Sequence, residues 1–379
     1  MGSSNRRTFL KAAASTAALQ RAAWPQSPPA VSPEHFVYLA GDGVRLTPLA
    51  YAQLLSTLTS GDTKADGYLK GGAIEELEGR FANLLHKERA LFFPTGTLAN
   101  HVAVRLLAGE RRHVLVQEES HLYRDEGDCA QALSGLNLVP LAPGRATIKT
   151  SEIVDAIEKA GAPPYPVPVG AIAIESPVRR TRGEAFDFEE MKKISAFARE
   201  RKIGMHLDGA RMYLASAYTG IAPVTYAELF DTVYVSLYKY FNAPFGAILA
   251  GPASLIEAAA ILRHQFGGGL LHAWQSAAVA LHYLEGFEER YQKAVRSGEE
   301  LFRRLEEKNV RVHRIEAGTN VVQLDFPSTP PAYFQKRLAD RGIFIGQSPA
   351  HGPLDIQINE TILRRPPQEI ADELVKALS

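Results

Sequence analysis

The sequence has one cysteine, no excess of charge and no long apolar run, and each shortage excludes a class of protein. The single cysteine, Cys129, can form no intramolecular disulfide and no cysteine-based metal cluster. The 42 basic and 42 acidic residues cancel and form no long basic run, so the charge gives no reason to expect nucleic acid as a partner. No stretch can span a bilayer, so the mature protein is expected to lack a membrane span. A small-molecule ligand is therefore the expectation.

The first residues are typical of an export signal. The stretch RRTFLK begins at Arg6 and is followed by an Ala-rich run up to Leu19, which is the pattern of a twin-arginine signal. A basic amphipathic tail is the alternative. The segment Trp24 to Pro33 is Pro-rich and favours a linker. We predict a signal and linker over residues 1–33 and a periplasmic location, or a cytoplasmic one if the signal does not function.

With 379 residues, of which 46% are hydrophobic, the chain is long enough for two domains. A helix is predicted from Thr47, its N-cap, and another over AIEELEGRFANLL. Short apolar runs, most of them separated by helical stretches, then predict strands: ALFF, HVLVQ, GAIAIE, IGMHLD, TVYVSL and FGAILA. This alternation favours an α/β domain with a mostly parallel sheet covered on both faces, over residues 34–275.

A smaller domain is predicted at the C-terminal end, over residues 276–379. After Gly267 to Gly269, one long helix is expected from about 270 to 308 and links the two domains. Four strand-like runs follow, VRVHRI, NVVQLDF, GIFIG and LDIQI, with helices around 331–341 and 367–378. A ligand site between the two domains is the default for such an arrangement.

Strand ends in an open α/β sheet are where functional groups gather. In FFPTGTLAN, a strand runs into Thr95, Gly96 and Thr97 and a helix then begins. The helix N-terminus and the threonine hydroxyls form a candidate phosphate cradle. Strand–turn–helix junctions of this composition are also common without any ligand.

Two further strand ends carry charged residues. Asp208 in HLDGARM either caps the following helix or holds a cationic group of a ligand, and Arg211 offers a planar fork for a carboxylate or phenolate. Lys239 in VSLYKYFNAPFG lies among aromatic residues, three positions after Ser236. It is either a snorkelling lysine or a desolvated amine suited to a Schiff base.

His121, which follows the strand HVLVQ, is by itself no more than a candidate, because most such histidines are structural. Together, however, the four features describe one ligand. A phosphate cradle, a carboxylate for a pyridinium nitrogen, a histidine to stack on a ring and an amine for an aldehyde are the requirements of pyridoxal 5′-phosphate.

These motifs resemble the low-specificity L-threonine aldolases, in the β-eliminating lyase branch of the aspartate-aminotransferase-like fold (fold type I). The resemblance runs from about Val37 to the C-terminus. Three blocks carry it: GDTKADGYLKGGAIEELEGRFANLLHKERALFFPTGTLAN, which joins a loop bearing Tyr68 to the phosphate cradle, HLDGARM, and SLYKYFNAPFGAILAG. It implies a PLP-dependent transferase-like large domain and a smaller C-terminal α/β domain.

The resemblance also implies a role for each candidate residue. His121 would stack on the cofactor ring, Asp208 would pair with the ring nitrogen, and Lys239 would form the Schiff base. Arg211 would reach the phenolate oxygen or the substrate carboxylate. The full cofactor-binding set is Thr95, Gly96, Thr97, His121, Asp208, Arg211, Ser236 and Lys239, with no metal.

The activity implied is cleavage of the Cα–Cβ bond of a β-hydroxy-α-amino acid, giving glycine and an aldehyde. The expected partner is a small-molecule amino-acid substrate, and a homodimer or homotetramer is expected because the family's sites use residues of two subunits. The substrate-contacting candidates are Tyr68, Arg179, Arg211 and Gln357.

The departures from the family pattern affect substrate recognition. Gly41 stands where a serine is usual, and Gln357 stands where the family has a carboxylate-binding arginine. Leu270, Leu271 and His272 occupy the place of an arginine that binds a neighbouring subunit's phosphate. The loop SPVRRTRGE replaces one that usually carries Asn and His, and Arg179, Arg180 or Arg182 is a hypothetical substitute anchor.

Three interpretations follow. The first is an aldolase on a β-hydroxy-α-amino acid. The second keeps the cofactor but has β-elimination, transamination or racemisation of another amino acid. The third is an exported scaffold without turnover, which the altered substrate positions allow.

Overall fold

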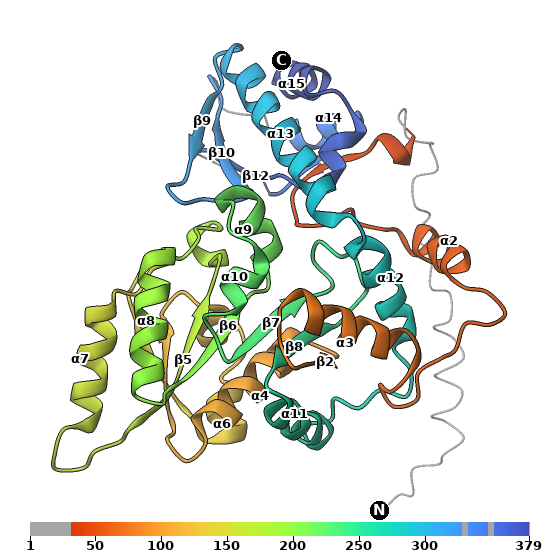
Figure 1. Ribbon diagram of the computed structural model, residues 1–379. Coiled ribbons are helices and arrows are strands. Elements are labelled where there is room, and N and C mark those ends of the chain that lie inside the picture. Colours follow the sequence, from red (N-terminus) through yellow and green to blue (C-terminus); the bar gives the residue numbers. More distant parts are fainter. Residues whose placement is uncertain (1–31, 328–332, 348–351, 379) are drawn as a thin grey trace, which may run out of the picture.

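The computed structural model describes residues 32–327, 333–347 and 352–378 (Figure 1). The predicted signal up to residue 31 lies outside the described residues. Beyond it, the large sheet contains seven strands in the order β2-β8-β7-β6-β5-β3-β4. Their bounds are β2 Arg89–Phe93, β3 His113–Gln117, β4 Asn137–Leu141, β5 Val169–Glu175, β6 Gly204–Asp208, β7 Thr232–Ser236 and β8 Ala247–Gly251.

The pairing of these strands confirms a mostly parallel sheet. Strands β3 to β7 pair in parallel with one another, and only β8 runs antiparallel to its neighbours β2 and β7. All seven residues of β5 are buried, as are those of β7 and β8. Such continuous burial is expected when helices cover both faces of a sheet.

The helices of this part follow the strands in sequence. They are α2 Pro48–Leu58, α3 Gly72–Leu84, α4 Gly96–Ala108, α5 His121–Arg124, α6 Cys129–Ser134, α7 Thr150–Gly161, η2 Arg179–Thr181, α8 Phe188–Glu200, α9 Met212–Thr219, α10 Pro223–Ala227 and α11 Ala253–Gln265. The Thr47 side chain accepts from the Ala50 N–H and caps α2, as predicted. Helix α4 packs on β5, β6, β7 and β8, so its N-terminus lies over the centre of the sheet.

The C-terminal part contains a smaller sheet of order β12-β10-β9. Its elements are α12 Trp274–Leu284, α13 Phe287–Glu306, β9 Arg311–Arg314, β10 Val321–Asp325, α14 Phe334–Ala339, β11 Ile343–Ile345, β12 Leu354–Gln357, η3 Glu360–Arg364 and α15 Pro367–Lys376. The single helix predicted from about 270 to 308 is in fact two helices. Gly286 has a φ of +64°, a left-handed conformation that interrupts the helix between α12 and α13.

The N-terminal strand lies with the C-terminal part rather than with the large sheet. Strand β1, Val37–Leu39, follows the short turn η1, Pro33–His35, and pairs in parallel with β11. The large-domain range 34–275 predicted from the sequence therefore differs from the structure at its N-terminal end. A three-residue strand carries no sign of its partner when that partner lies some 300 residues away in the chain.

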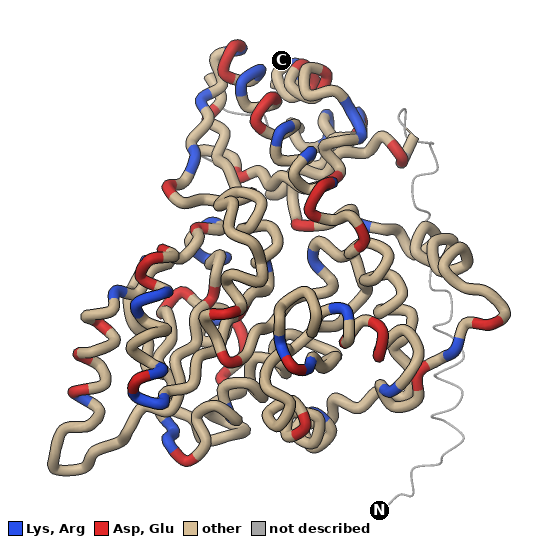
Figure 2. Tube along the Cα trace, viewed as in Figure 1, with Lys and Arg blue, Asp and Glu red and all other residues tan. Residues whose placement is uncertain are grey.

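Charged residues of both signs are scattered over both parts of the trace (Figure 2). Within the described ranges, no helix combines the length and the apolar character needed to cross a membrane.

Candidate active site

Parallel strands bring the candidate residues to one edge of the large sheet. Strands β5 and β6 are in register, with Glu175 beside Asp208 at their carboxyl ends. Ser236 ends the parallel neighbour β7. Helix α5, which begins with His121, follows β3 at the same edge. Four segments distant in the sequence thus converge where ligands bind in open α/β sheets.

Asp208 is a buried carboxylate that does not cap a helix. Its Oδ1 accepts the Ala210 N–H at 3.1 Å, and its Oδ2 accepts the Asn100 amide at 2.8 Å. Helix α9 begins instead after Arg211, with no side-chain cap. The capping alternative is therefore wrong, and Asp208 keeps lone pairs that can accept a ligand N–H.

A chain of buried hydrogen bonds, from His206 through Asn100, fixes the position of Asp208. Burial lowers the pKa of His206 to about 4, so this imidazole is neutral at pH 7. Its Nε2 lies 3.0 Å from Asn100 Oδ1, which can only accept, so we assign the proton to Nε2. The Nδ2 group of Asn100 then directs its two hydrogens to Asp208 and to Glu126 Oε1, the latter at 2.9 Å.

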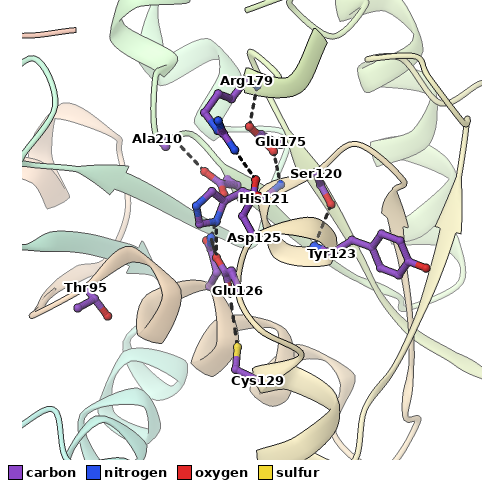
Figure 3. Close-up of polar contacts among 12 residues, drawn as sticks. Thr95, Ser120, His121, Tyr123, Asp125, Glu126, Cys129, Glu175, Arg179 and Ala210 are labelled. Atoms are coloured by element: carbon purple, nitrogen blue, oxygen red, sulfur yellow. Dashed lines mark hydrogen bonds and ion pairs between the residues drawn. The ribbon is translucent and has the colours of Figure 1, made fainter. Parts of the chain in front are cut away.

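His121 is oriented by two glutamates (Figure 3). Its Nδ1 lies 2.9 Å from Glu126 Oε1, and its backbone N–H donates to Glu175 Oε2 at 2.6 Å. The bond to Glu126 raises the pKa of His121. Burial raises the pKa of Glu126, and burial followed by the nearby Asp208 charge raises that of Glu175 to about 7. The ring plane of His121 is thus fixed beside Asp208.

The cluster of His121, Glu126 and Asp208 has its ligand atoms within 4.8 Å of one another, close enough to hold a metal cation. The amide hydrogens of Asn100 point to both carboxylates, however, and would face such a cation with positive charge. A ring N–H donated to Asp208 meets no such conflict. The donor set therefore fits a protonated heterocycle better than a metal.

The predicted phosphate cradle is formed by the N-terminus of α4 and the end of β7. The hydroxyl of Thr95 accepts the Leu98 N–H at 3.2 Å and so caps the helix rather than facing the His121 group, from which it lies apart in Figure 3. A Cβ on Gly96 would lie 2.2 Å from the hydroxyl oxygen of Tyr234, so only glycine fits there. The Oγ of Ser236 is buried and forms no hydrogen bond of ordinary length with the described residues, and its polar neighbour is the hydroxyl of Tyr234, two residues before it on β7.

An unpartnered buried hydroxyl is costly, and the first N–H groups of a helix attract anions. Tyr234, which approaches Gly96, lies two residues before Ser236 on β7, so the Ser236 hydroxyl near the N-terminus of α4 fits a phosphate group. The phosphate-binding role of Thr97, in the first turn of α4, stays a prediction. The hydroxyl of Thr95 is better described as a helix cap than as a phosphate ligand.

Lys239 lies in the loop between β7 and β8, not at a dry strand end. It is half-buried, and its Nζ lies 4.9 Å from the centroid of the Tyr238 ring. Tyr240 is fully buried in the core, whereas Tyr238 is 45% exposed. Only one of the two flanking tyrosines is therefore buried, because the chain leaves the sheet after Ser236 and turns Tyr238 outward.

A cavity of about 650 Å³, here called the Lys239 cavity, connects this loop to the N-terminal segment. It is lined by Gly41, Asp42, Gly43, Arg45, Leu46, Pro48, Tyr51, Arg211, Tyr238, Lys239, Asn242, Ala243 and Pro244. Arg211 Nε donates to Asp42 Oδ2 at 2.9 Å, and Asp42 Oδ1 also accepts from Asn320 at 3.2 Å. The predicted amine and the predicted guanidinium therefore face one space.

Two other predicted substrate-binding residues, Gln357 and Tyr68, do not line the Lys239 cavity. Oε1 of Gln357 accepts the N–H of Gly41, so the two departures from the family pattern contact each other. Tyr68 does not line the Lys239 cavity; it is 65% exposed, and its N–H donates to the Leu271 carbonyl at 2.9 Å.

The arginines of the loop after Glu175 are held by carboxylates. Arg179 and Arg180 each contact Asp125 at 2.6 Å. Hydrogen bonds from Arg180 and Arg179 lower the pKa of Asp125 to about 2. Arg182 lies 3.5 Å from Asp355. The substitute-anchor role suggested for these arginines stays a prediction, and each already has an anionic partner.

Sequence reasoning missed several polar residues of the site. Asn100 lies one turn after Gly96 on α4, and His206 lies two residues before Asp208 on the same face of β6, so helix and strand periodicity could have found both. Glu175 is a lone acid at the end of an apolar strand, which is also a signal. Glu126 gave no signal.

A comparison with models of protein families shows to which family the chain belongs. Residues 44–326 match the model of the beta-eliminating lyases, a range that contains the whole large sheet and Lys239. The chain belongs to the beta-eliminating lyase family. This membership confirms the resemblance seen in the sequence and supports pyridoxal phosphate as the cofactor of this beta-eliminating lyase.

Curated relatives of this beta-eliminating lyase include two yeast proteins. The low-specificity L-threonine aldolase of Candida albicans is 31% identical over 212 residues, which are 55% of this chain and 56% of that protein. The low specificity L-threonine aldolase of Saccharomyces cerevisiae is 31% identical over 54% of this chain and 53% of its own length. The chain thus spans about half the length of these relatives.

Solved structures confirm the fold class. A protein of Exiguobacterium sp. 255-15, provisionally described as an aromatic amino acid beta-eliminating lyase/threonine aldolase, aligns with a TM-score of 0.77 at 25% identity and covers 91% of this chain and 97% of its own. An SPT that contains pyridoxal phosphate aligns at 0.64 and 16% identity over 90% of this chain and 87% of its own, which shows the fold alone.

Proposed function

We propose that this beta-eliminating lyase is a pyridoxal phosphate-dependent enzyme that cleaves the Cα–Cβ bond of a β-hydroxy-α-amino acid to glycine and an aldehyde. One observation carries the proposal: buried Asp208, fixed by Asn100 and His206, lies at the same sheet edge as the unpartnered hydroxyl of Ser236. Lys239 follows Ser236 by three residues. The names of the threonine aldolase relatives support the choice of reaction.

Different residues would bind different parts of the cofactor. Ser236 and the N-terminus of α4 would hold its phosphate, and the carboxylate of Asp208 would accept the N–H of its ring. His121, oriented by Glu126, would lie against the ring, and Lys239 would supply the amine for its aldehyde. When bound, the cofactor supplies a cationic ring that accepts the electrons released at Cα.

Arg211 and Asp42 line the side of the Lys239 cavity nearest the C-terminal part. Their ion pair is buried, with side-chain exposures of 14% and 7%. A buried guanidinium with terminal N–H groups still to donate is suited to the oxygens of the cofactor or of a substrate carboxylate. The substrate amine therefore enters beside Lys239, with Arg211 across the cavity.

The absorption spectrum of the purified protein tests the cofactor assignment. We expect a visible absorption band at about 400 nm or above, as a Schiff base of this cofactor gives, and we expect it to be absent in Lys239→Ala. Lys159→Ala, an exposed lysine on α7, is the matched control and keeps the band. A band that survives in Lys239→Ala would contradict the role of this lysine.

The presence of Gln357 in place of an arginine favours a second candidate function, in which the same cofactor catalyses a reaction other than aldol cleavage. A neutral side chain that binds the loop at Gly41 replaces the arginine expected by resemblance. Orientation of the substrate decides which bond at Cα breaks, so β-elimination, transamination or racemisation is the second candidate. Product analysis with a series of amino acids separates these reactions from aldol cleavage and from a scaffold without turnover.

We further propose export by the twin-arginine route, on the motif that begins at Arg6. A protein that receives its cofactor in the cytosol has to cross the membrane folded, and without a disulfide it needs no oxidising compartment to fold. Replacing Arg6 and Arg7 by lysine should retain the protein in the cytoplasmic fraction. Unchanged fractionation would contradict the proposal.

A further inference from the structure

The Lys239 cavity contains two basic side chains that form no ion pair among the described residues, Lys239 itself and Arg45. Its lining includes three basic residues, Lys239, Arg211 and Arg45, and one acid, Asp42. Asp42 is paired with Arg211 at 2.9 Å. Within the part of the chain that the structure describes, Arg45 forms no ion pair. A cavity with this balance of charge attracts an anionic group.

The segment that carries Arg45 is fixed directly against the loop of Lys239. The Val44 N–H donates to Asn242 Oδ1 at 2.7 Å. A Cβ on Gly43 would lie 2.4 Å from the carbonyl oxygen of Lys239 and 2.3 Å from Asn242 Oδ1. The Val44–Asn242 hydrogen bond and the close approach at Gly43, which leaves no room for a side chain, place residue 45 next to the loop of Lys239.

The side chain of Arg45 is supported on one side. Its guanidinium carbon lies 5.5 Å from the centroid of the Tyr38 ring, and its Nη2 lies 3.3 Å from the position that a Cβ on Gly41 would take. The absence of a side chain at Gly41 therefore leaves room for the guanidinium. A planar cation stacked on an aromatic ring keeps its N–H edge available for a carboxylate.

The other candidate anchors are less suitable. Gln357 is neutral, and its carbonyl oxygen already accepts the Gly41 N–H. Arg179 and Arg180 both bind Asp125 and do not line the Lys239 cavity. Arg211 shares its charge with Asp42.

We propose that Arg45 binds the α-carboxylate of the amino-acid substrate and so takes the place of the missing arginine on β12. The inference rests on the proposed function only in that the ligand is an amino acid. Tyr38 and Gly41 shape the position of the guanidinium, and Asn242 links it to the lysine loop.

The test measures binding rather than turnover. Titration calorimetry on the holoenzyme gives the dissociation constant of glycine, the simplest amino acid, and of methylamine, which lacks the carboxylate. We expect Arg45→Gln to weaken glycine ~10- to 100-fold, the range for loss of a charge-assisted hydrogen bond, and to leave methylamine unchanged. Arg45→Lys should restore part of the affinity because the charge is kept.

Arg201→Gln is the matched control, because Arg201 also stacks on a ring, that of Phe197, but lies outside the Lys239 cavity. It should leave both affinities unchanged. Unchanged glycine binding in Arg45→Gln, an equal loss for methylamine, or wild-type protein that does not bind glycine would each overturn the proposal. If Arg45→Gln does not fold, Arg45→Lys carries the comparison. Glycine binding that depends on Arg45 without any aldehyde release would contradict the proposed function alone.

Discussion

At the scale of single residues, the site depends on the buried side-chain amide of Asn100, which bonds both to the two carboxylates and to the histidine of the network. Asn100 donates to Asp208, 108 positions away in the chain, and to Glu126, and it accepts from His206. No local pattern links two residues this far apart, so sequence reasoning found Asp208 but not Asn100, although the helix period after Gly96 marks the position of Asn100. The amide explains why Asp208 has a defined orientation before any ligand binds.

We predict that Asn100→Ala destabilises the protein by about 1–3 kcal/mol, because it leaves buried acceptors without donors. It should also weaken cofactor binding, since Asp208 loses its orientation. Denaturant unfolding and cofactor titration measure the two effects. Asn137→Ala, on the sheet-edge strand β4, changes the same side chain away from the site and serves as the control. Equal behaviour of the two variants would show that the network is dispensable.

His206 makes stability depend on pH. Its pKa falls from 6.5 to about 4 on folding, so the unfolded chain binds more protons between these values. The stabilising effect of the neutral imidazole is complete above about pH 6.5 and is lost as the pH falls toward 4. The pKa of Glu175 is raised in the folded protein, so Glu175 changes stability with pH in the opposite direction. The contribution of His206 is therefore measured by comparing the wild type with a variant that lacks His206.

We predict that the free energy of unfolding of the wild type, minus that of His206→Gln, rises by up to about 3 kcal/mol between pH 4 and 6.5. Denaturant titrations of both proteins at several pH values measure this difference. A difference that does not change with pH would mean that His206 is already charged in the folded protein.

At the scale of elements, the apolar periods predicted six of the seven strands of the large sheet, because strands buried on both faces are continuous apolar runs. The edge strand β4 was missed, because it is largely exposed and contains Pro140. Helices α2, α3 and α4 were predicted individually, and the others only as unspecified helical stretches. The predicted helix over 270–308 failed at Gly286, where only the structure reveals a left-handed residue. The sequence also predicted the turn at Gly96 before α4. It did not reveal that Tyr234 is the neighbour that requires a glycine there. Tyr234 approaches Gly96 from a strand 138 positions further along the chain.

We predict that Gly96→Ala destabilises the protein by ~1–3 kcal/mol and weakens cofactor binding, because the added methyl group overlaps Tyr234. Gly79→Ala on α3 is the control, since nothing lies within 4 Å of its Cβ position and alanine favours a helix. Thermal unfolding should show a loss for the first variant and no loss or a small gain for the second. Equal melting temperatures would contradict the close approach.

At the scale of the whole molecule, an exposed apolar surface suggests how the chain assembles. Helix α2 has no buried residue, and Leu49 is 68% exposed. Tyr68 and Leu271, which are 65% and 56% exposed, lie side by side through their backbone bond. Exposed apolar residues that are adjacent in space, as Tyr68 and Leu271 are, are typical of an interface. The sequence alone could not place these residues together.

We therefore predict a homodimer or homotetramer in which this surface is buried. Analytical ultracentrifugation of the wild type should give a multiple of the 41.4 kDa calculated for the whole chain, less any signal that is removed. The variant Leu271→Asp should shift the mass toward the monomer, since burying an unpaired charge is costly. Leu133→Asp, equally exposed on α6, is the control. A monomeric wild type would contradict the prediction.

The measurement that tests the account most directly is the release of products from β-hydroxy-α-amino acids by the purified holoenzyme. We predict glycine and the matching aldehyde in equal amounts from at least one such substrate, and neither product with Lys239→Ala. Loss of the substrate with formation of a keto acid, ammonia or an inverted stereocentre in place of glycine and aldehyde would contradict the central claim.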